Sequence, residues 1–130
     1  MSDPGSLPAV ESLYDLIGEA GLRQLVAMFY RQIPTDPVLG PMYPGQALNE
    51  AEQRLADFLI FRCGGPDTYL QQRGHPRLRM RHAPFPIDQT ARDRWVALMD
   101  NAFSEIGWSA PARISLQTFL HDSASFLINR

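Results

Sequence analysis

Apolar residues recur at helical spacing along four stretches of this 130-residue chain, and no segment alternates as a half-buried strand would. The stretches cover residues 21–33, 48–62, 88–106 and 109–127, and a shorter helix is expected over 10–17. The pattern is clearest in the third stretch, whose apolar stripe is Trp95, Leu98, Met99, Ala102, Phe103 and Ile106. The spacing predicts an all-α fold, and a chain of this length can enclose one core.

Local signals set the ends of these helices. Asp88 and Ser109 are the expected N-caps of the third and fourth stretches, and Pro111 is tolerated in the first turn that follows Ser109. Gly64 and Gly65 supply a stop after the second stretch.

Charge and composition exclude several classes of protein. The net charge is −2, which argues against a surface built as a whole for nucleic acid. No apolar run approaches the ~20 residues of a membrane span, and the first ten residues lack the features of a secretory signal. Cys63 is the only cysteine, so we expect a buried, reduced thiol in a cytoplasmic protein with no membrane or nucleic-acid partner.

Two irregular segments separate the helical stretches. The sequence IPTDPVLGPMYPG, residues 33–45, has four prolines in thirteen residues and predicts an ordered but irregular connection. Residues 64–87 are rich in Gly, Pro and Arg and too irregular for one long helix. Long segments of this kind tend to carry function, so we expect this one to cross the open side of the four helices, with something filling the gap.

The second irregular segment contains RGHPRLRMRHAPFPI, with four arginines in nine residues before His82. Because Pro84 disfavours the helical conformation at Ala83, a short helix ending there would present His82 from its last turn. An iron held in an anionic organic ring requires one such nitrogen, with cations for the carboxylates of the ring. His82 is therefore a candidate metal ligand.

Plainer interpretations of these residues stay open. A lone histidine is more often a surface or core residue, and an arginine run is more often a solvated face or a phosphate-binding patch. His75 is expected in a turn, and His121 at the edge of the last helix. The chain has no HExxH motif and no Cys/His pair, so the pattern gives little support to a zinc site.

Three motifs, in order, resemble the group II truncated haemoglobins, a family of two-on-two helical sandwiches around haem. They are FYRQIPTDPVLGPMYP, LADFLIFRCGGPDTYLQQRGHPRLRMRHAPFPI and RDRWVALMDNA. The second motif is much the most specific, and the resemblance runs roughly from Leu13 to Leu127. It implies a truncated globin domain over residues 13–130, preceded by an N-terminal extension over 1–12.

The resemblance implies roles for residues on both sides of a haem b. His82 matches the proximal iron ligand of the family, and Gly64 and Gly65 match the glycine pair that turns the chain toward it. Arg62 and Cys63 stand where more aromatic character is expected. The distal, ligand-binding positions match Tyr30, Tyr43, Trp95, Ala51 and Leu55.

Other residues are expected to contact the haem itself. Arg77, Arg79 and Arg81 cannot all face it from one short helix, so we expect Arg79 and Arg81 to approach the propionates. The remaining cofactor contacts are expected from Phe29, Phe58, Leu78 and Met80.

The distal residues determine the function that the resemblance implies. Two tyrosine hydroxyls and an indole N–H can donate hydrogen bonds to a diatomic ligand that gains negative charge. Each bond is worth roughly 1–3 kcal/mol, or about tenfold to a hundredfold in dissociation. The expected function is high-affinity binding of O2, CO, NO or peroxide, used in redox chemistry with an external reductase and not in simple O2 transport.

Two alternatives to this function stay open. The protein could sense or scavenge gas without turnover, or it could be a haem-free helical module that binds polyanions through Arg73–Arg81. The sequence allows a monomer or a homo-oligomer.

Overall fold

The computed structural model describes residues 7–130, and these form six α-helices and three short 3-10 helices without any β-strand. The α-helices are α1 (Leu13–Arg31), α2 (Ala47–Arg62), α3 (Thr68–Arg73), α4 (Leu78–His82), α5 (Gln89–Ile106) and α6 (Ala110–Phe126). The 3-10 helices are η1 (Val10–Ser12), η2 (Ile33–Thr35) and η3 (Gly40–Met42). The prediction of an all-α fold is confirmed. The part of the expected N-terminal extension before residue 7 lies outside the described residues.

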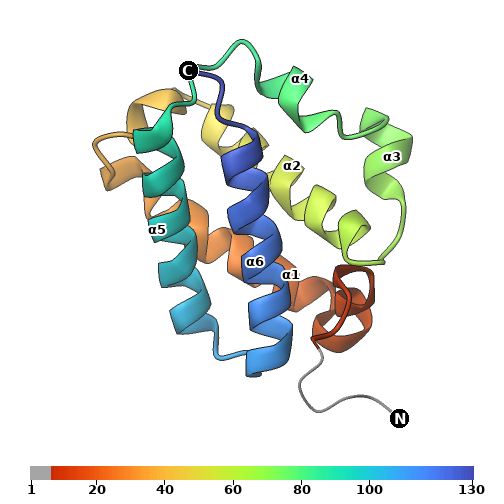
Figure 1. The fold of residues 1–130 in the computed structure, drawn as a ribbon. Coiled ribbons are helices and arrows are strands. Elements are labelled where there is room, and N and C mark those ends of the chain that lie inside the picture. Colours follow the sequence, from red (N-terminus) through yellow and green to blue (C-terminus); the bar gives the residue numbers. More distant parts are fainter. Residues whose placement is uncertain (1–6) are drawn as a thin grey trace.

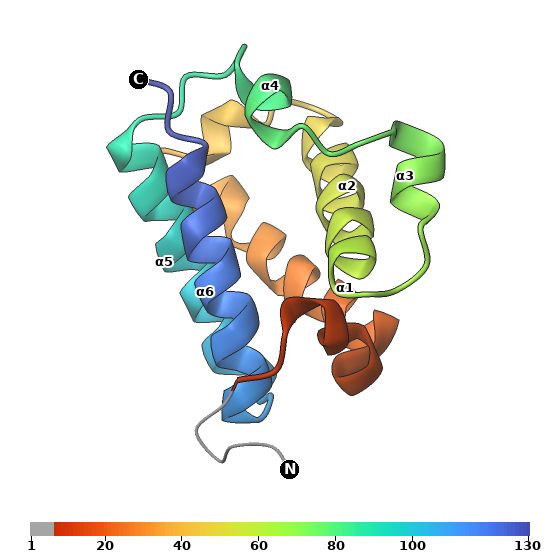
Figure 2. The ribbon, with the colours of Figure 1, turned by 45° about the vertical axis from the view of Figure 1, so that its right-hand side comes forward.

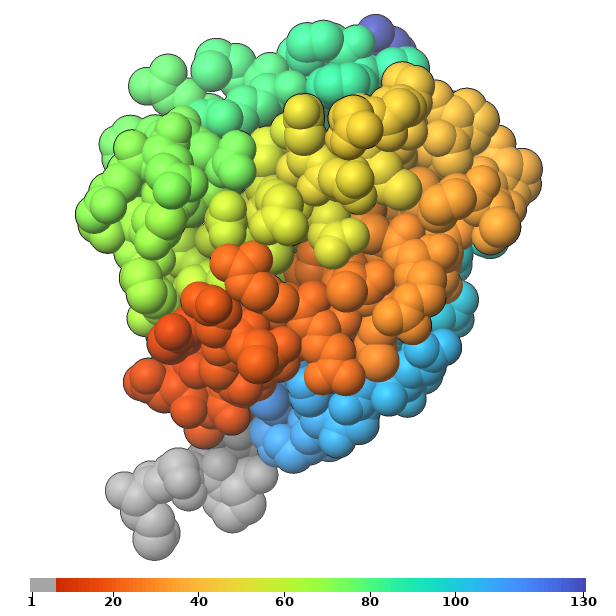
Figure 3. Space-filling model, turned by 180° about the vertical axis from the view of Figure 1, so that it is seen from behind, coloured from red at the N-terminus to blue at the C-terminus, as the bar shows by residue number. Residues whose placement is uncertain are grey.

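Four long helices form two crossed pairs, as the two-on-two arrangement requires. α1 packs against both α2 and α5, and α5 packs against α6. Figure 1 shows α5 and α6 side by side, with α1 crossing behind them. Figure 3 shows the opposite face, where the orange α1 and the yellow α2 lie next to each other. Burial of the apolar stripes between these pairs drives the packing, and Phe29, Leu59, Met99 and Phe103 are at most 2% exposed.

The ends of the helices follow most of the expected signals. The side chain of Asp88 caps α5 by accepting the Ala91 N–H at 2.8 Å. Ser109 occupies the N-cap position of α6, but its hydroxyl makes no capping hydrogen bond, so that part of the prediction is wrong. Gly64 follows α2 with a φ of +97°, and a Cβ there would overlap the carbonyl oxygen of Glu11.

The two helices that the sequence predicts over 10–17 and 21–33 meet within α1, on either side of a non-helical residue. α1 runs from Leu13 to Arg31 through a kink at Gly18, whose φ is +83°. A residue with a side chain is strained at this φ, and glycine adopts it freely. The kink therefore joins the expected short helix to the longer one.

The two irregular segments are ordered by short helices. Residues 33–45 contain η2 and η3, and residues 64–87 contain α3 and α4. Figure 2 shows α4 at one end of the molecule, between the yellow N-terminal end of α2 and the C-terminal end of α6. Across residues 7–130, the structure contains no helix with the length and apolar character needed to span a bilayer.

Candidate functional site

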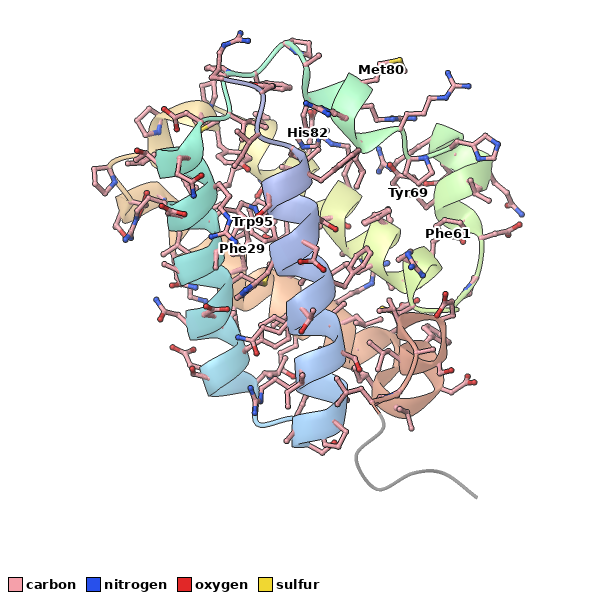
Figure 4. All side chains as sticks on the ribbon, viewed as in Figure 1. Phe29, Phe61, Tyr69, Met80, His82 and Trp95 are labelled. Carbon is pink, nitrogen blue, oxygen red and sulfur yellow. The ribbon has the colours of Figure 1, made fainter. Side chains whose placement is uncertain are left out.

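His82 is the last residue of α4, and its imidazole orientation is fixed from within the helix. Nδ1 of His82 lies 2.7 Å from the carbonyl oxygen of Leu78, one turn earlier. Since that carbonyl is an acceptor, the bonded tautomer carries its proton on Nδ1 and leaves the Nε2 lone pair available. Figure 4 shows His82 on the side of α4 that faces the long helices. This is the arrangement that a metal-binding imidazole requires.

Tyr30 and Tyr43, two of the expected distal residues, lie next to each other. Tyr30 ends the buried stripe of α1, and Tyr43 follows η3; their ring centroids lie 5.9 Å apart in edge-to-face geometry. Burial is the main cause that raises the pKa of both phenols, that of Tyr30 well above its usual value. The neighbouring Tyr43 raises the pKa of Tyr30 further. Both groups are therefore neutral donors at physiological pH.

Phe29 links this tyrosine pair to Trp95 of α5. The Phe29 ring lies 4.9 Å from the Tyr30 ring and 5.0 Å from the Trp95 ring, measured between centroids. Figure 4 shows Phe29 and Trp95 next to each other. Phe29 is fully buried, whereas Trp95 is partly exposed at the edge of the core. Phe29 thus contacts two of the expected distal donors, Tyr30 and Trp95, and the third, Tyr43, contacts Tyr30.

The three expected site residues of α2 lie along one face of that helix. Ala51, Leu55 and Phe58 are four and three residues apart, so their side chains follow one another at successive turns. Ala51 is 8% exposed and Phe58 is 7% exposed. Phe58 packs against Tyr69 of α3 and Phe119 of α6, with centroid distances of 5.6 Å and 6.5 Å. Through Phe58, this face of α2 therefore contacts both α3 and α6.

The arginines of α4 have different partners from one another. The guanidinium of Arg79 lies over the ring of Phe126, 5.5 Å from its centroid. Arg81 instead donates through Nη2 to the backbone carbonyls of Arg73 and His75, so it braces the turn between α3 and α4. This bracing role is not predicted from the sequence, because it depends on the path of the loop.

Leu78 and Met80 lie on different sides of α4. Leu78 packs partly buried against the core, in agreement with a place beside a cofactor. Met80 is 60% exposed, and Figure 4 shows its sulfur directed away from the long helices. Its present contacts give no support to the cofactor role expected for it.

Tyr69 belongs to an aromatic cluster on α2 and α3 that the sequence analysis did not foresee. Tyr69 is 4% exposed and stacks on Phe61, with ring centroids 6.2 Å apart and an interplanar angle of 11°. Figure 4 shows the two rings beside α3 and α2. The signal was present, because Tyr69 belongs to the most specific motif of the resemblance, but no role was assigned to it.

The donor set at His82 fits a haem. It consists of one oriented imidazole near aromatic and aliphatic side chains, and a porphyrin supplies the other four nitrogen ligands of its iron. Among residues 7–130, no three His, Cys, Asp or Glu side chains gather where they could hold a metal ion on their own.

Comparison with known proteins agrees with this geometry. The family model described as "Bacterial-like globin" matches residues 12–128. The chain is similar to the group 2 truncated hemoglobin YjbI of Bacillus subtilis (strain 168), with 37% identity over 117 residues that cover 90% of this chain and 88% of that protein. It is 30% identical to the two-on-two hemoglobin-3 of Arabidopsis thaliana over 120 residues, which cover 90% and 69% of the two chains.

Solved structures show the same fold. The hemoglobin of Chloroflexus aurantiacus superposes with a TM-score of 0.87 at 41% identity, over 92% of this chain and 98% of that chain. A truncated oxygen-avid haemoglobin from Bacillus subtilis superposes with a TM-score of 0.85 at 36% identity, over 91% and 99%. The chain is therefore a member of the bacterial-like globin family, in its group II truncated haemoglobin branch, and that membership implies a haem that binds diatomic gases.

Proposed function

We propose that this globin binds haem b through Nε2 of His82 and retains O2 and similar ligands tightly, for redox chemistry in the cytoplasm. The observation that carries the proposal is the edge-to-face contact of the buried Tyr30 with the partly buried Tyr43, close to Trp95 across Phe29. Phenol hydroxyls in a largely desolvated site can donate hydrogen bonds to a charged or polarised ligand.

The proximal residues hold the cofactor in this proposal. The carbonyl of Leu78 keeps the proton of His82 on Nδ1, so Nε2 faces the iron as a neutral ligand. Arg79 is exposed and lies over the ring of Phe126, so it can turn to pair with a propionate. Arg81 would have to give up its bonds to two backbone carbonyls, which makes it the weaker candidate.

The distal residues hold the ligand. When bound, the haem supplies an iron that takes up O2, CO, NO or peroxide and changes oxidation state. Tyr30, Tyr43 and the indole N–H of Trp95 donate to the ligand, and burial excludes competing water from Tyr30. Each such bond slows ligand release by about tenfold or more. The Bacillus subtilis structure described as oxygen-avid supports the same property here.

Slow release suits chemistry better than transport. We propose that one NO and one O2 are converted with one electron into one nitrate ion, or that peroxide is reduced, with the electrons supplied by an external reductase. Ligand positioning by Tyr30 and Tyr43 serves both reactions, because each develops negative charge on oxygen.

Three measurements test this function. The pyridine haemochrome spectrum identifies haem b, stopped-flow mixing gives the O2 dissociation rate, and a reductase-coupled assay compares NO consumed with nitrate formed. We expect slow O2 release and a nitrate yield of about one per NO. Rapid release that Tyr30→Phe leaves unchanged would contradict tight binding, whereas slow release without turnover would contradict the redox role and favour a sensor or scavenger.

A further inference from the structure

The segment that follows His82 can pair few of its backbone N–H and carbonyl groups within itself. Residues 83–87 read APFPI, and Pro84 and Pro86 have no N–H. Within the segment, the N–H of Phe85 donates to the carbonyl of His82 at 2.9 Å, which closes one turn. The carbonyl of Phe85 and the N–H of Ile87 need partners from another part of the chain.

The side chain of Asn129 supplies these partners. Its Oδ1 accepts the N–H of Ile87 at 2.9 Å. Its Nδ2 donates to the carbonyls of Phe85 at 2.9 Å and of His82 at 3.3 Å. The backbone N–H of Asn129 also donates to the carbonyl of Ile87 at 2.8 Å. Four hydrogen bonds thus connect the penultimate residue of the chain to the His82–Ile87 segment.

The chemistry of this clamp is specific to an amide. The segment presents one donor and two acceptors to a single side chain, and only Asn and Gln carry both an acceptor oxygen and an NH2 group with two donors. A carboxylate would place a negative oxygen against two carbonyls. A serine has only one proton to donate.

α4 needs such external support. It has five residues, which is too short for a helix to be stable in isolation. The C-terminal end of the chain contacts both flanks of α4, since Phe126 carries the guanidinium of Arg79 and Asn129 holds the carbonyl of His82. Figure 1 shows the chain end beside the segment that leads from α4 to α5.

We infer that Asn129 is a positioning residue for the proximal histidine. Its amide fixes the backbone at His82, and the Leu78 carbonyl fixes the imidazole, so the direction of Nε2 is set from two sides. This inference rests on the proposed role of His82 as the iron ligand. The expected consequence is that the amide of Asn129 controls the strain of the iron–histidine bond and the retention of haem.

The test uses Asn129→Asp, with Asn101→Asp as the matched control. Asn101 is exposed on α5, and its Nδ2 donates to Gln32. The readouts are the iron–histidine stretching band of the ferrous protein, the rate of haem transfer to apomyoglobin, and the amide exchange rate of Ile87 in the haem-free protein. We expect a shifted or broadened band and about tenfold faster haem loss and amide exchange for Asn129→Asp only.

A second pair of variants keeps the test decisive if Asn129→Asp folds poorly. Asn129→Gln retains the donors and the acceptor, whereas Asn129→Ala loses them, so Gln should lie closer to the wild type in all three readouts. Equal values for Gln and Ala, or an Asn129→Asp protein identical to the wild type, would overturn the inference. If the wild type takes up haem but has no iron–histidine band, the proposed role of His82 fails instead, and the exchange rate of Ile87 still reports on the clamp.

Discussion

The carboxylate of Asp36 accepts two hydrogen bonds from the guanidinium of Arg94, one from Nε at 3.0 Å and one from Nη2 at 2.6 Å. Its second oxygen accepts the N–H groups of Val38 and Leu39, which orders the turn toward Tyr43. Arg94 directly precedes Trp95 on α5. The pair therefore joins the loop and the helix that carry two of the proposed distal donors.

Replacing Asp36 by Asn tests the contribution of this pair to stability. The backbone N–H of Leu39 is the main cause that lowers the pKa of Asp36, with Arg94 and Val38 adding to it. A lowered pKa stabilises the fold above the unfolded-state value of about 3.9, and this stability is lost as the pH falls through the folded-state pKa. We expect Asp36→Asn to lose about 1–3 kcal/mol in urea unfolding at neutral pH and to depend less on pH below about 4.

The exposed Asp93 of α5 offers a matched control for this experiment. Its contacts with Gln89 and Arg92 lie at the surface, so Asp93→Asn should change the free energy of unfolding by less than about 0.5 kcal/mol. If the free energy of unfolding of Asp36→Asn varied with pH in parallel with that of the wild type, the Asp36 carboxylate would not stabilise the fold.

Tyr30→Phe and Tyr43→Phe test the distal pair. Each is expected to raise the O2 dissociation rate about tenfold to a hundredfold, because each removes a proposed hydroxyl donor to the ligand. Since the two rings are in edge-to-face contact, the effects of the two changes should not add. Stopped-flow measurements on both single variants and the double variant complete the cycle. Tyr69→Phe, in the Phe58–Phe61 aromatic cluster, is the control and should leave the rate unchanged.

Cys63 should be unreactive in the folded protein. Burial is the main cause that raises the pKa of its thiol to about 12, so the nucleophilic thiolate is scarce at pH 8. Labelling by a disulfide reagent is expected to be slow in buffer and rapid in guanidinium chloride. Equal labelling rates under the two conditions would show that the thiol is open to solvent in the native state.

Alanine variants at Gly64 and Gly45 distinguish the cost of steric overlap from the cost of an unfavourable backbone conformation. Both have positive φ, +97° and +58°, but only at Gly64 would a Cβ meet another atom, the carbonyl oxygen of Glu11. Gly45→Ala should cost about 1–2 kcal/mol, and Gly64→Ala should cost about 4 kcal/mol or more. Chemical denaturation of both variants measures the difference. Similar losses would mean that the contact with Glu11 relaxes freely.

The sequence predicts the parts of this fold that follow from local chemistry. The stripe of α5 and the capping of that helix by Asp88 can be recognised because burial follows helical periodicity and the cap follows residue type. The unused hydroxyl of Ser109 depends on how neighbouring elements pack, so no local pattern reveals it.

The same limit applies to the site. His82 stands out by its position in a specific motif, and its proposed role as the iron ligand stays a prediction. The bonds of Arg81 to loop carbonyls and of Asn129 to the His82–Ile87 segment connect groups whose proximity only the folded chain sets. Asn129 is 47 residues from His82 in sequence, which no periodicity argument can bridge.

We propose that His82 alone supplies the protein ligand to the haem iron. The most direct measurement is the visible spectrum of the ferrous protein with and without carbon monoxide, for the wild type, His82→Gly and the control His75→Gly. We predict a carbon monoxide-sensitive Soret band in the wild type and in His75→Gly, an abnormal or absent band in His82→Gly, and recovery of that band when free imidazole fills the place of the lost side chain. An unchanged Soret band in His82→Gly without imidazole would contradict the claim.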